Sequence, residues 1–522
     1  MKSIIARVGL AFAALVLGST TLSSAATQDT PTKKVVAQAP AKEHAKSPFS
    51  YKGFVRAYYF TRQNASGGVP AVNQQSFNLG LDLHGDYKFV GTPFSIGATY
   101  FYANPLGTCS SAFDHAFGSA CVSNKAPGVN PDDTLPGYTL STLMETYVKY
   151  NDGRFNATLG NQLYATPWAN PSDSRIKPAA FQGVDANYAF NKTWSLEGSY
   201  MMRFESRTSS AFDNTTLITA CVPGTNGIEN TSAGTGCGVG SYPRITNQGF
   251  LYGKLAYNGP KGFSANANVY SFNNLANLTY LEGRYNLQTM PKFKPYVMAQ
   301  YALEKNTGNA IVGKINATAF GLKAGLSLTP NIDFSVGYDT VPSKSDTYSN
   351  AQIAATGTAC AVGAGATNGF IKGNGTLPYW LPQGGNPDCT VNAAAGTTTI
   401  YYGGFASPYT FSYATDPFFT TSMTQGFADR GMSGSAVKAQ LNFTSTDKRF
   451  NGILSRAYYN YNNGAGVSPT QETDADAWYY LQKPGKGLLV RYRYGERTQQ
   501  FTSAFGGLPL FKYNRAQLEY DF

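Results

Sequence analysis

The sequence has few charged residues and very few histidines. Charged residues make up 14% of the 522 residues, whereas glycine, phenylalanine and tyrosine occur 55, 33 and 36 times, a balance that suits β structure. The three histidines, His44, His84 and His115, lie in different segments, so none stands beside a nucleophile as hydrolytic chemistry requires. No phosphate-binding or dinucleotide-binding glycine motif follows a strand and opens a helix. We therefore expect neither an enzyme nor a protein with a cofactor.

Long apolar runs are also missing. Beyond the first residues, no run reaches the roughly 18 apolar residues that a transmembrane helix needs. At the start, Lys2 and Arg7 precede an apolar stretch and small residues follow it, which predicts a cleaved secretory signal peptide over residues 1–26. Residues 27–48 are poor in large apolar side chains and predict a flexible periplasmic tail. The remaining residues, 49–522, are expected to form one domain.

Charge and cysteine content narrow the choice of partners. Lysine and arginine number 41 against 30 acidic residues, but the basic residues are dispersed and form no aromatic-interleaved patch, so no nucleic-acid partner is expected.

The cysteines fall two at a time into three irregular segments. Export and this clustering favour three local disulfides among the 15 connectivities that six cysteines allow. The expected pairs are Cys109 with Cys121, Cys221 with Cys237, and Cys360 with Cys389. Their spacings lack the two-to-four-residue interval of a zinc site, and no metal site is expected.

Most of the chain alternates polar and apolar residues with a period of two, as half-exposed β-strands do. In residues 510–522, for example, Leu518 and Tyr520 alternate with Gln517 and Glu519. Eighteen strands are expected, at residues 51–62, 76–89, 93–103, 139–150, 154–162, 181–190, 193–206, 246–258, 263–272, 275–287, 293–304, 316–328, 331–340, 433–445, 449–460, 476–482, 487–499 and 510–522.

The connections between these strands alternate between short turns and long polar segments. An even strand number, long loops on one side and short turns on the other are typical of bacterial outer-membrane barrels. The sequence thus predicts an all-β fold: a transmembrane antiparallel β-barrel with apolar rows against outer-membrane lipid. At eighteen strands the interior is too wide for side chains to fill, so an aqueous channel is expected.

One stretch of about forty residues resembles the OprD family of substrate-specific outer-membrane porins. It comprises LxETYVKY at 143–150, GNQ at 160–162, TPxxNxxDSRxxP at 166–178 and FQG at 181–183. The resemblance implies a multi-pass barrel in the outer membrane of a Gram-negative-type bacterium. It also implies a third extracellular loop, here residues 163–180, that folds inward and narrows the lumen. Members of the family pass small carboxylate-bearing or cationic nutrients by passive diffusion, so small charged solutes are the expected partners.

The composition of residues 163–180 agrees with a constriction. Pro167, Pro171 and Pro178 would stiffen a loop that crosses a wet pore. The expected constriction residues are Asp173, Ser174 and Arg175 in the loop, flanked by Glu145 and Asp185 on strands. The alternative is a surface loop pinned by an Asp–Arg ion pair with no solute contact.

Cations at inward-facing strand positions form a second candidate site. The expected basic ladder comprises Arg56, Lys438, Arg456, Arg491, Arg493 and Arg515. Barrel closure would put these residues at different depths on nearly one wall, although residues 476–482 contribute only Trp478 and Tyr480 there. The alternative is a wall of solvated arginines with weak anion preference and no recognised ligand.

A different function also remains open. Residues 341–432 form a very long loop, and loops of such length are usually functional or disordered. The alternative function is therefore a surface adhesin or structural barrel whose binding is carried by this loop. The sequence leaves the oligomeric state open, with a homo-oligomer as one option.

Overall fold

The structure is a computed structural model. It describes residues 47–63, 74–106, 139–171, 175–207, 209–219, 244–288, 290, 292–310, 313–349, 351, 389–410, 416–462, 467–498 and 510–522. The expected signal peptide and nearly all of the expected tail lie outside these ranges, so both remain predictions. The same holds for five of the six cysteines, and Cys389 lies in β17 (Cys389–Asn392). The predicted disulfide pairing therefore also remains a prediction.

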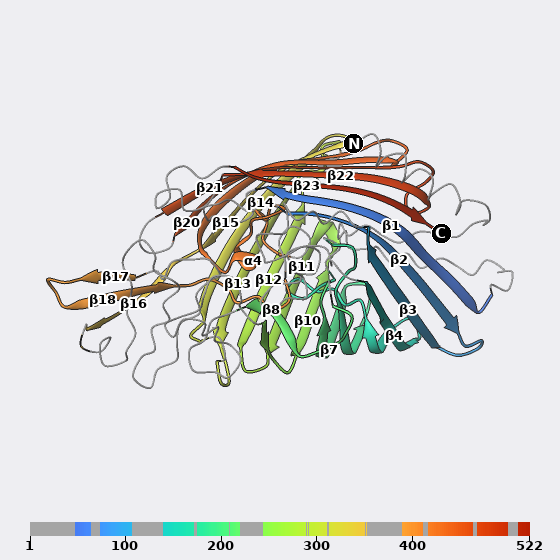
Figure 1. Cartoon of the computed structure of the whole chain (residues 1–522), viewed down its shortest axis with the longest axis horizontal. Helices are drawn as coiled ribbons and strands as arrows, with labels where there is room; N and C mark the ends of the chain where they lie inside the picture. Colours follow the sequence, from blue (N-terminus) through green and yellow to red (C-terminus); the bar gives the residue numbers. More distant parts are fainter. Residues whose placement is uncertain are drawn as a thin grey trace.

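Eighteen antiparallel strands form one closed barrel (Figure 1). Closure is made by β1 and β23, where Phe54 to Gln63 pair with Asp521 to Lys512. The barrel strands are β1 (Phe49–Gln63), β2 (Gln74–Lys88), β3 (Phe94–Pro105), β4 (Leu140–Asn151), β5 (Phe155–Gln162), β6 (Ala180–Ala189), β7 (Trp194–Glu205), β10 (Phe250–Asn258), β11 (Phe263–Phe272), β12 (Ala276–Asn286), β13 (Tyr296–Asn306), β14 (Asn316–Thr329), β15 (Ile332–Val341), β19 (Ser433–Thr444), β20 (Phe450–Asn462), β21 (Val467–Tyr480), β22 (Gly487–Arg497) and β23 (Phe511–Asp521). The predicted fold class and strand number are confirmed.

The largest error in the strand boundaries concerns β21. This strand begins at Val467, whereas the sequence predicted a strand over 476–482. The added residues run VSPTQETDA and show little apolar alternation. They lie at the long-loop end of the barrel, where the outer face meets water rather than lipid, so the period-two signal is lost there.

The outer face of the barrel is apolar. Leu196, Leu251, Leu322 and Leu454 point outward and are 47–64% exposed. An apolar belt of this extent is stable only against lipid, and a closed sheet leaves no unpaired backbone edge there. Among the described residues, no helix is long and apolar enough to cross a membrane.

Two small sheets and one short helix do not belong to the barrel wall. Strand β8 (Thr215–Thr219) pairs with β9 (Arg244–Thr246). Strand β18 (Thr397–Tyr402) pairs with both β16 (Lys344–Ser349) and β17, and this three-stranded sheet projects away from the barrel (Figure 1). The short helix α4 (Phe427–Arg430) belongs to the segment between β18 and β19, which we call the β18–β19 loop (residues 403–432).

Candidate functional site

The loop between β5 and β6 (residues 163–179, the β5–β6 loop) lies inside the barrel. Trp168, Ala169 and Ile176 are completely buried. The backbone N–H of Trp168 donates a hydrogen bond of 3.2 Å to the Tyr270 hydroxyl, and its ring centroid lies 6.3 Å from that of Tyr280. Both tyrosines are buried on the inward face of β11 and β12. The described residues of this loop therefore pack against the inward face of the barrel wall.

A buried ion pair fixes the far end of the β5–β6 loop. Lys177 Nζ lies 2.8 Å from Glu205 Oε1 at the end of β7, and neither side chain is exposed. Burial lowers the pKa of Lys177 below its ordinary value, although Glu205 opposes the shift. No pattern in the sequence indicated this pair, because 28 residues separate its partners.

The β18–β19 loop is a second segment inside the barrel. Its Phe405 and Phe427 are fully buried. The Trp168 ring centroid lies 5.1 Å from that of Phe405 and 5.7 Å from that of Phe418, so the two inward loops contact each other. The sequence did not indicate this arrangement, and surface binding by residues 341–432 was the alternative function that it left open. Aromatic residues such as Phe405, Tyr409 and Phe418, unusual in a solvated loop, were the available signal.

Wall carboxylates hold the β18–β19 loop through its backbone N–H groups. Glu304 on β13 accepts from Ala406 at 2.7 Å, and Asp339 on β15 accepts from the amide and the hydroxyl of Thr420, both at 2.7 Å. On β21, Glu472 accepts from Thr424 at 2.8 Å and Asp474 accepts from Met423 at 3.1 Å. These bonds give buried backbone N–H groups of the loop a partner on the wall, so they define the position of the loop.

Lys438, one of the predicted ladder residues, also contacts this loop. It faces inward from β19 and is 9% exposed. Its Nζ donates to the backbone oxygen of Thr421 at 2.5 Å. Lys438 therefore positions the β18–β19 loop.

Arg175 in the β5–β6 loop approaches two further arginines on the barrel wall. In the strand register, Arg493 on β22 lies opposite Arg515 on β23, and Arg515 lies opposite Phe60 on β1. The guanidinium of Arg175 lies 5.3 Å from the Phe60 ring centroid, and that of Arg515 lies 4.5 Å from the Tyr58 ring centroid. We call Arg175, Arg493 and Arg515 the arginine cluster. Their exposures are 9%, 2% and 0%, so the cluster lies in a largely desolvated part of the lumen.

The predicted ladder is also interleaved with acids. Asp476 on β21 accepts from Arg491 at 2.9 and 2.7 Å and from Arg493 at 2.8 Å. Arg56 forms an ion pair with Glu519 and donates to the backbone oxygen of Ile176 in the β5–β6 loop at 3.3 Å. The β21 strand therefore contributes an acid where the sequence analysis saw only Trp478 and Tyr480.

Arg456 does not belong to the ladder, and this part of the prediction is wrong. On β20 the buried residues are Ser455, Ala457 and Tyr459, which leaves Arg456 on the outer face. It donates to Tyr458 at 2.9 Å, and its other hydrogen bonds also go to exposed side chains. Near the long-loop end polar residues occupy both faces of a strand, so a charged side chain alone does not identify the lumen face.

The structure describes only some of the other predicted constriction residues. Asp173 and Ser174 lie outside the described residues. Glu145 on β4 accepts from the Leu163 amide at 3.1 Å and from Thr99 at 2.5 Å, and therefore holds the start of the β5–β6 loop.

His84 on β2 lies beside Glu145 and Asp86. Its Nδ1 is 3.5 Å from Glu145 Oε2 and its Nε2 is 2.5 Å from Asp86 Oδ2. Asp185 faces the lumen from β6, near the ion pair of Lys254 and Glu197 and away from the strands that carry the arginine cluster. Within the described part of the chain, no group of three or more His, Cys, Asp or Glu residues is arranged so that it could hold a metal ion.

The barrel resembles solved structures of outer-membrane porins. Over 91% of this chain, it matches 98% of Pseudomonas aeruginosa OpdK, solved with vanillate, at a TM-score of 0.58 and 12% identity. It matches 98% of P. aeruginosa OccK9 (OpdG) and 99% of Acinetobacter baumannii OccAB3, each at a TM-score of 0.61, with 13% and 12% identity. No protein-family model and no curated relative matches the sequence. The chain therefore has the fold of the Opd and Occ porins.

Proposed function

We propose that this chain is an OprD-type porin in the outer membrane of a Gram-negative-type bacterium. It passes small carboxylate-bearing solutes by passive diffusion through a lumen narrowed by its two inward loops. The observation that carries the proposal is the approach of Arg175, from a loop inside the barrel, to Arg493 and Arg515 on the wall. Residues 1–26 are proposed to direct export, and residues 27–48 to form a periplasmic tail.

The arginine cluster suits a carboxylate because guanidinium groups bind it through paired hydrogen bonds. The field of several cations in a low-dielectric tube also concentrates anions at the entrance. Arg56 on β1 and Arg491 on β22 add further guanidinium groups, which pair with Glu519 and Asp476. A carboxylate that moves along this wall can therefore pass from one guanidinium group to the next.

Carboxylate side chains on the same wall weaken the binding of a carboxylate solute, so the solute can leave again. Asp476 already bonds Arg491 and Arg493, so an incoming carboxylate exchanges with it rather than entering a bare cationic site. Such exchange weakens the hold on the solute, and conduction requires a solute to leave as readily as it enters.

Aromatic side chains beside the arginine cluster favour solutes with an apolar part. Tyr58, Phe60 and Tyr513 are buried on β1 and β23 next to Arg515. OpdK, which shares the fold, was solved with vanillate, an aromatic carboxylate. Aromatic and aliphatic monocarboxylates are therefore the proposed solute class.

Surface binding by the long loop is the second candidate function. The three-stranded sheet β16–β18–β17 projects from the barrel and offers a surface for it. However, the described residues 403–410 and 416–428 of the same loop are almost all buried. That part of the loop supports a role inside the barrel.

Liposome-swelling rates for the purified full chain test the proposal. The solutes are a monocarboxylate, an uncharged sugar and a cationic amino acid of similar size. The proposal predicts the fastest entry for the carboxylate. An impermeable barrel would support the surface-binding alternative, and entry in order of size alone would remove the selectivity.

A further inference from the structure

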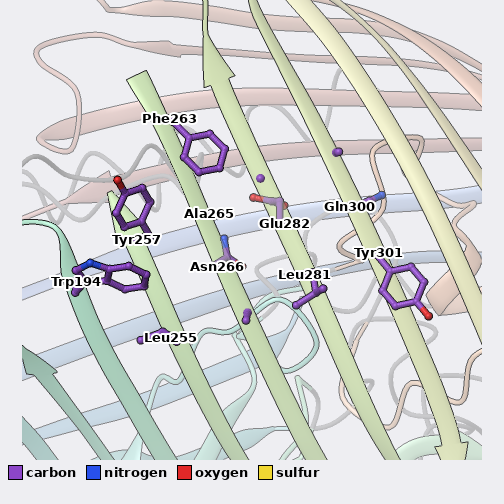
Figure 2. Close-up of a pocket in the computed structure, with 13 residues that line it drawn as sticks. Trp194, Leu255, Tyr257, Phe263, Ala265, Asn266, Leu281, Glu282, Gln300 and Tyr301 are labelled. Atoms are coloured by element: carbon purple, nitrogen blue, oxygen red, sulfur yellow. The ribbon is translucent and has the colours of Figure 1, made fainter. Parts of the chain in front are cut away.

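The outer face of the barrel carries an apolar groove of about 630 Å³ across β7 and β10–β13. Its floor consists of small residues brought together by strand register. Ala265 on β11 pairs with Gly283 on β12, and Gly283 pairs with Ala299 on β13. Trp194 and Tyr257 rise on one side of this floor (Figure 2). Elsewhere the apolar belt has large outward side chains such as Leu322 and Leu454, so the groove is a local depression in it.

The groove lies at the short-turn end of the barrel. Trp194 begins β7, Phe263 begins β11, and Tyr257 is the next-to-last residue of β10. The first strand begins at Phe49 and the last strand ends at Asp521, and both residues lie at this short-turn end of the barrel. In outer-membrane barrels the short turns face the periplasm, so the groove borders the inner leaflet.

The turns next to the groove are basic. The β6–β7 turn (residues 190–193) carries Lys192, and the β12–β13 turn (residues 287–295) carries Lys292 and Lys294. All three lysines are exposed, and neither turn contains an acidic residue. The turns after β4 and β19 differ, because each contains an aspartate together with its basic residues.

We infer that this groove binds an anionic phospholipid of the inner leaflet. One acyl chain lies over the floor of Ala265, Gly283 and Ala299, and the phosphate headgroup lies beside Lys292 and Lys294 in the β12–β13 turn next to this floor. Lys192, on the other flank of the groove, adds positive charge to the same surface. The apolar groove alone would accept any lipid, and the lysines select the negative headgroup by charge complementarity. A two-fold contact between two copies at this face would bring the lysine turns of both copies together, so like charges disfavour that occupant.

Trp194, at the edge of the groove, provides a direct assay. The full chain is placed in phosphatidylethanolamine vesicles that contain a small fraction of phosphatidylglycerol. Bromine atoms on the acyl chains of one lipid or the other then quench nearby tryptophan fluorescence. Subtracting the signal of a W194F variant isolates Trp194 from the three other tryptophans.

Brominated phosphatidylglycerol should quench Trp194 at least threefold more strongly than the same fraction of brominated phosphatidylethanolamine. The triple variant K192Q/K292Q/K294Q should abolish the difference. The matched control K483Q/K486Q, which removes charge from the β21–β22 turn, should keep it. Equal quenching by the two lipids in the unaltered protein would overturn the inference. Protection of Trp194 from both lipids would also overturn it and indicate a second copy on this face.

Discussion

Lys177 and Glu205 form an ion pair of 2.8 Å with no exposed surface on either side chain. The pair joins the β5–β6 loop to the end of β7 inside the barrel. Removing one partner leaves an uncompensated buried charge, whereas replacing both by apolar residues can be nearly neutral. This asymmetry makes the pair a sensitive test of whether the loop stays in the lumen.

Glu205→Ala should release the end of the β5–β6 loop, because Lys177 then seeks water. The free energy of unfolding should fall by about 3–5 kcal/mol, and single-channel conductance should rise. The double variant K177M/E205L should recover most of the stability and the native conductance. A conductance unchanged in Glu205→Ala would show that this end of the loop does not limit the pore.

The carboxylates that hold the β18–β19 loop should matter in the same way. D339N/E472Q weakens four hydrogen bonds to Thr420 and Thr424. We expect a loss of about 1–3 kcal/mol at each position, together with noisier open-channel current. The matched control is D185N, because Asp185 faces the lumen from β6, near the ion pair of Lys254 and Glu197. Equal noise in D185N would contradict a specific role for the loop anchors.

The barrel could be predicted because each strand shows its own alternation of apolar and polar residues, independent of the rest of the chain. The period-two alternation of each strand reflects lipid on one face and the lumen on the other. It weakens wherever the outer face leaves the lipid, which explains both the late predicted start of β21 and the wrong face of Arg456. The inward β5–β6 loop was predicted from its motif resemblance rather than from the alternation.

The remainder of the site depends on contacts between distant parts of the chain. Asp339 lies 81 residues from Thr420, and Arg56 lies 463 residues from Glu519. Neither sequence spacing nor residue type shows which carboxylate holds a loop and which one pairs with an arginine. The prediction therefore named arginines on these strands but not the carboxylates that bond them.

Asp476 should set the strength of the anion preference. Asp476→Asn removes the carboxylate that bonds both Arg491 and Arg493. Reversal potentials in a chloride gradient should shift toward the chloride potential, and a carboxylate solute should dwell longer in the pore. Asp185→Asn changes an acid on another part of the wall and should have a smaller effect. An equal shift in the two variants would mean that only the summed charge of the lumen matters.

A variant of Arg456 tests whether this residue lies on the outer face of the barrel and not in the lumen. Arg456→Ala removes a cation from the outer face, where its hydrogen bonds reach exposed side chains. Ion selectivity should stay at the native value, and stability should change by about 0.5 kcal/mol or less. A loss of anion preference comparable to that of an Arg493 variant would mean that Arg456 acts in the lumen.

The central claim is that Arg175, Arg493 and Arg515 together form the carboxylate-selective part of the lumen. The most direct measurement compares uptake of a monocarboxylate with that of an uncharged sugar of equal size, in the native protein and in R175Q/R493Q/R515Q. The uptake ratio of carboxylate to sugar should fall at least about tenfold in the triple variant, because each lost charge-assisted hydrogen bond contributes roughly 1.5 kcal/mol or more. A ratio that stays unchanged in a correctly folded triple variant would contradict the claim.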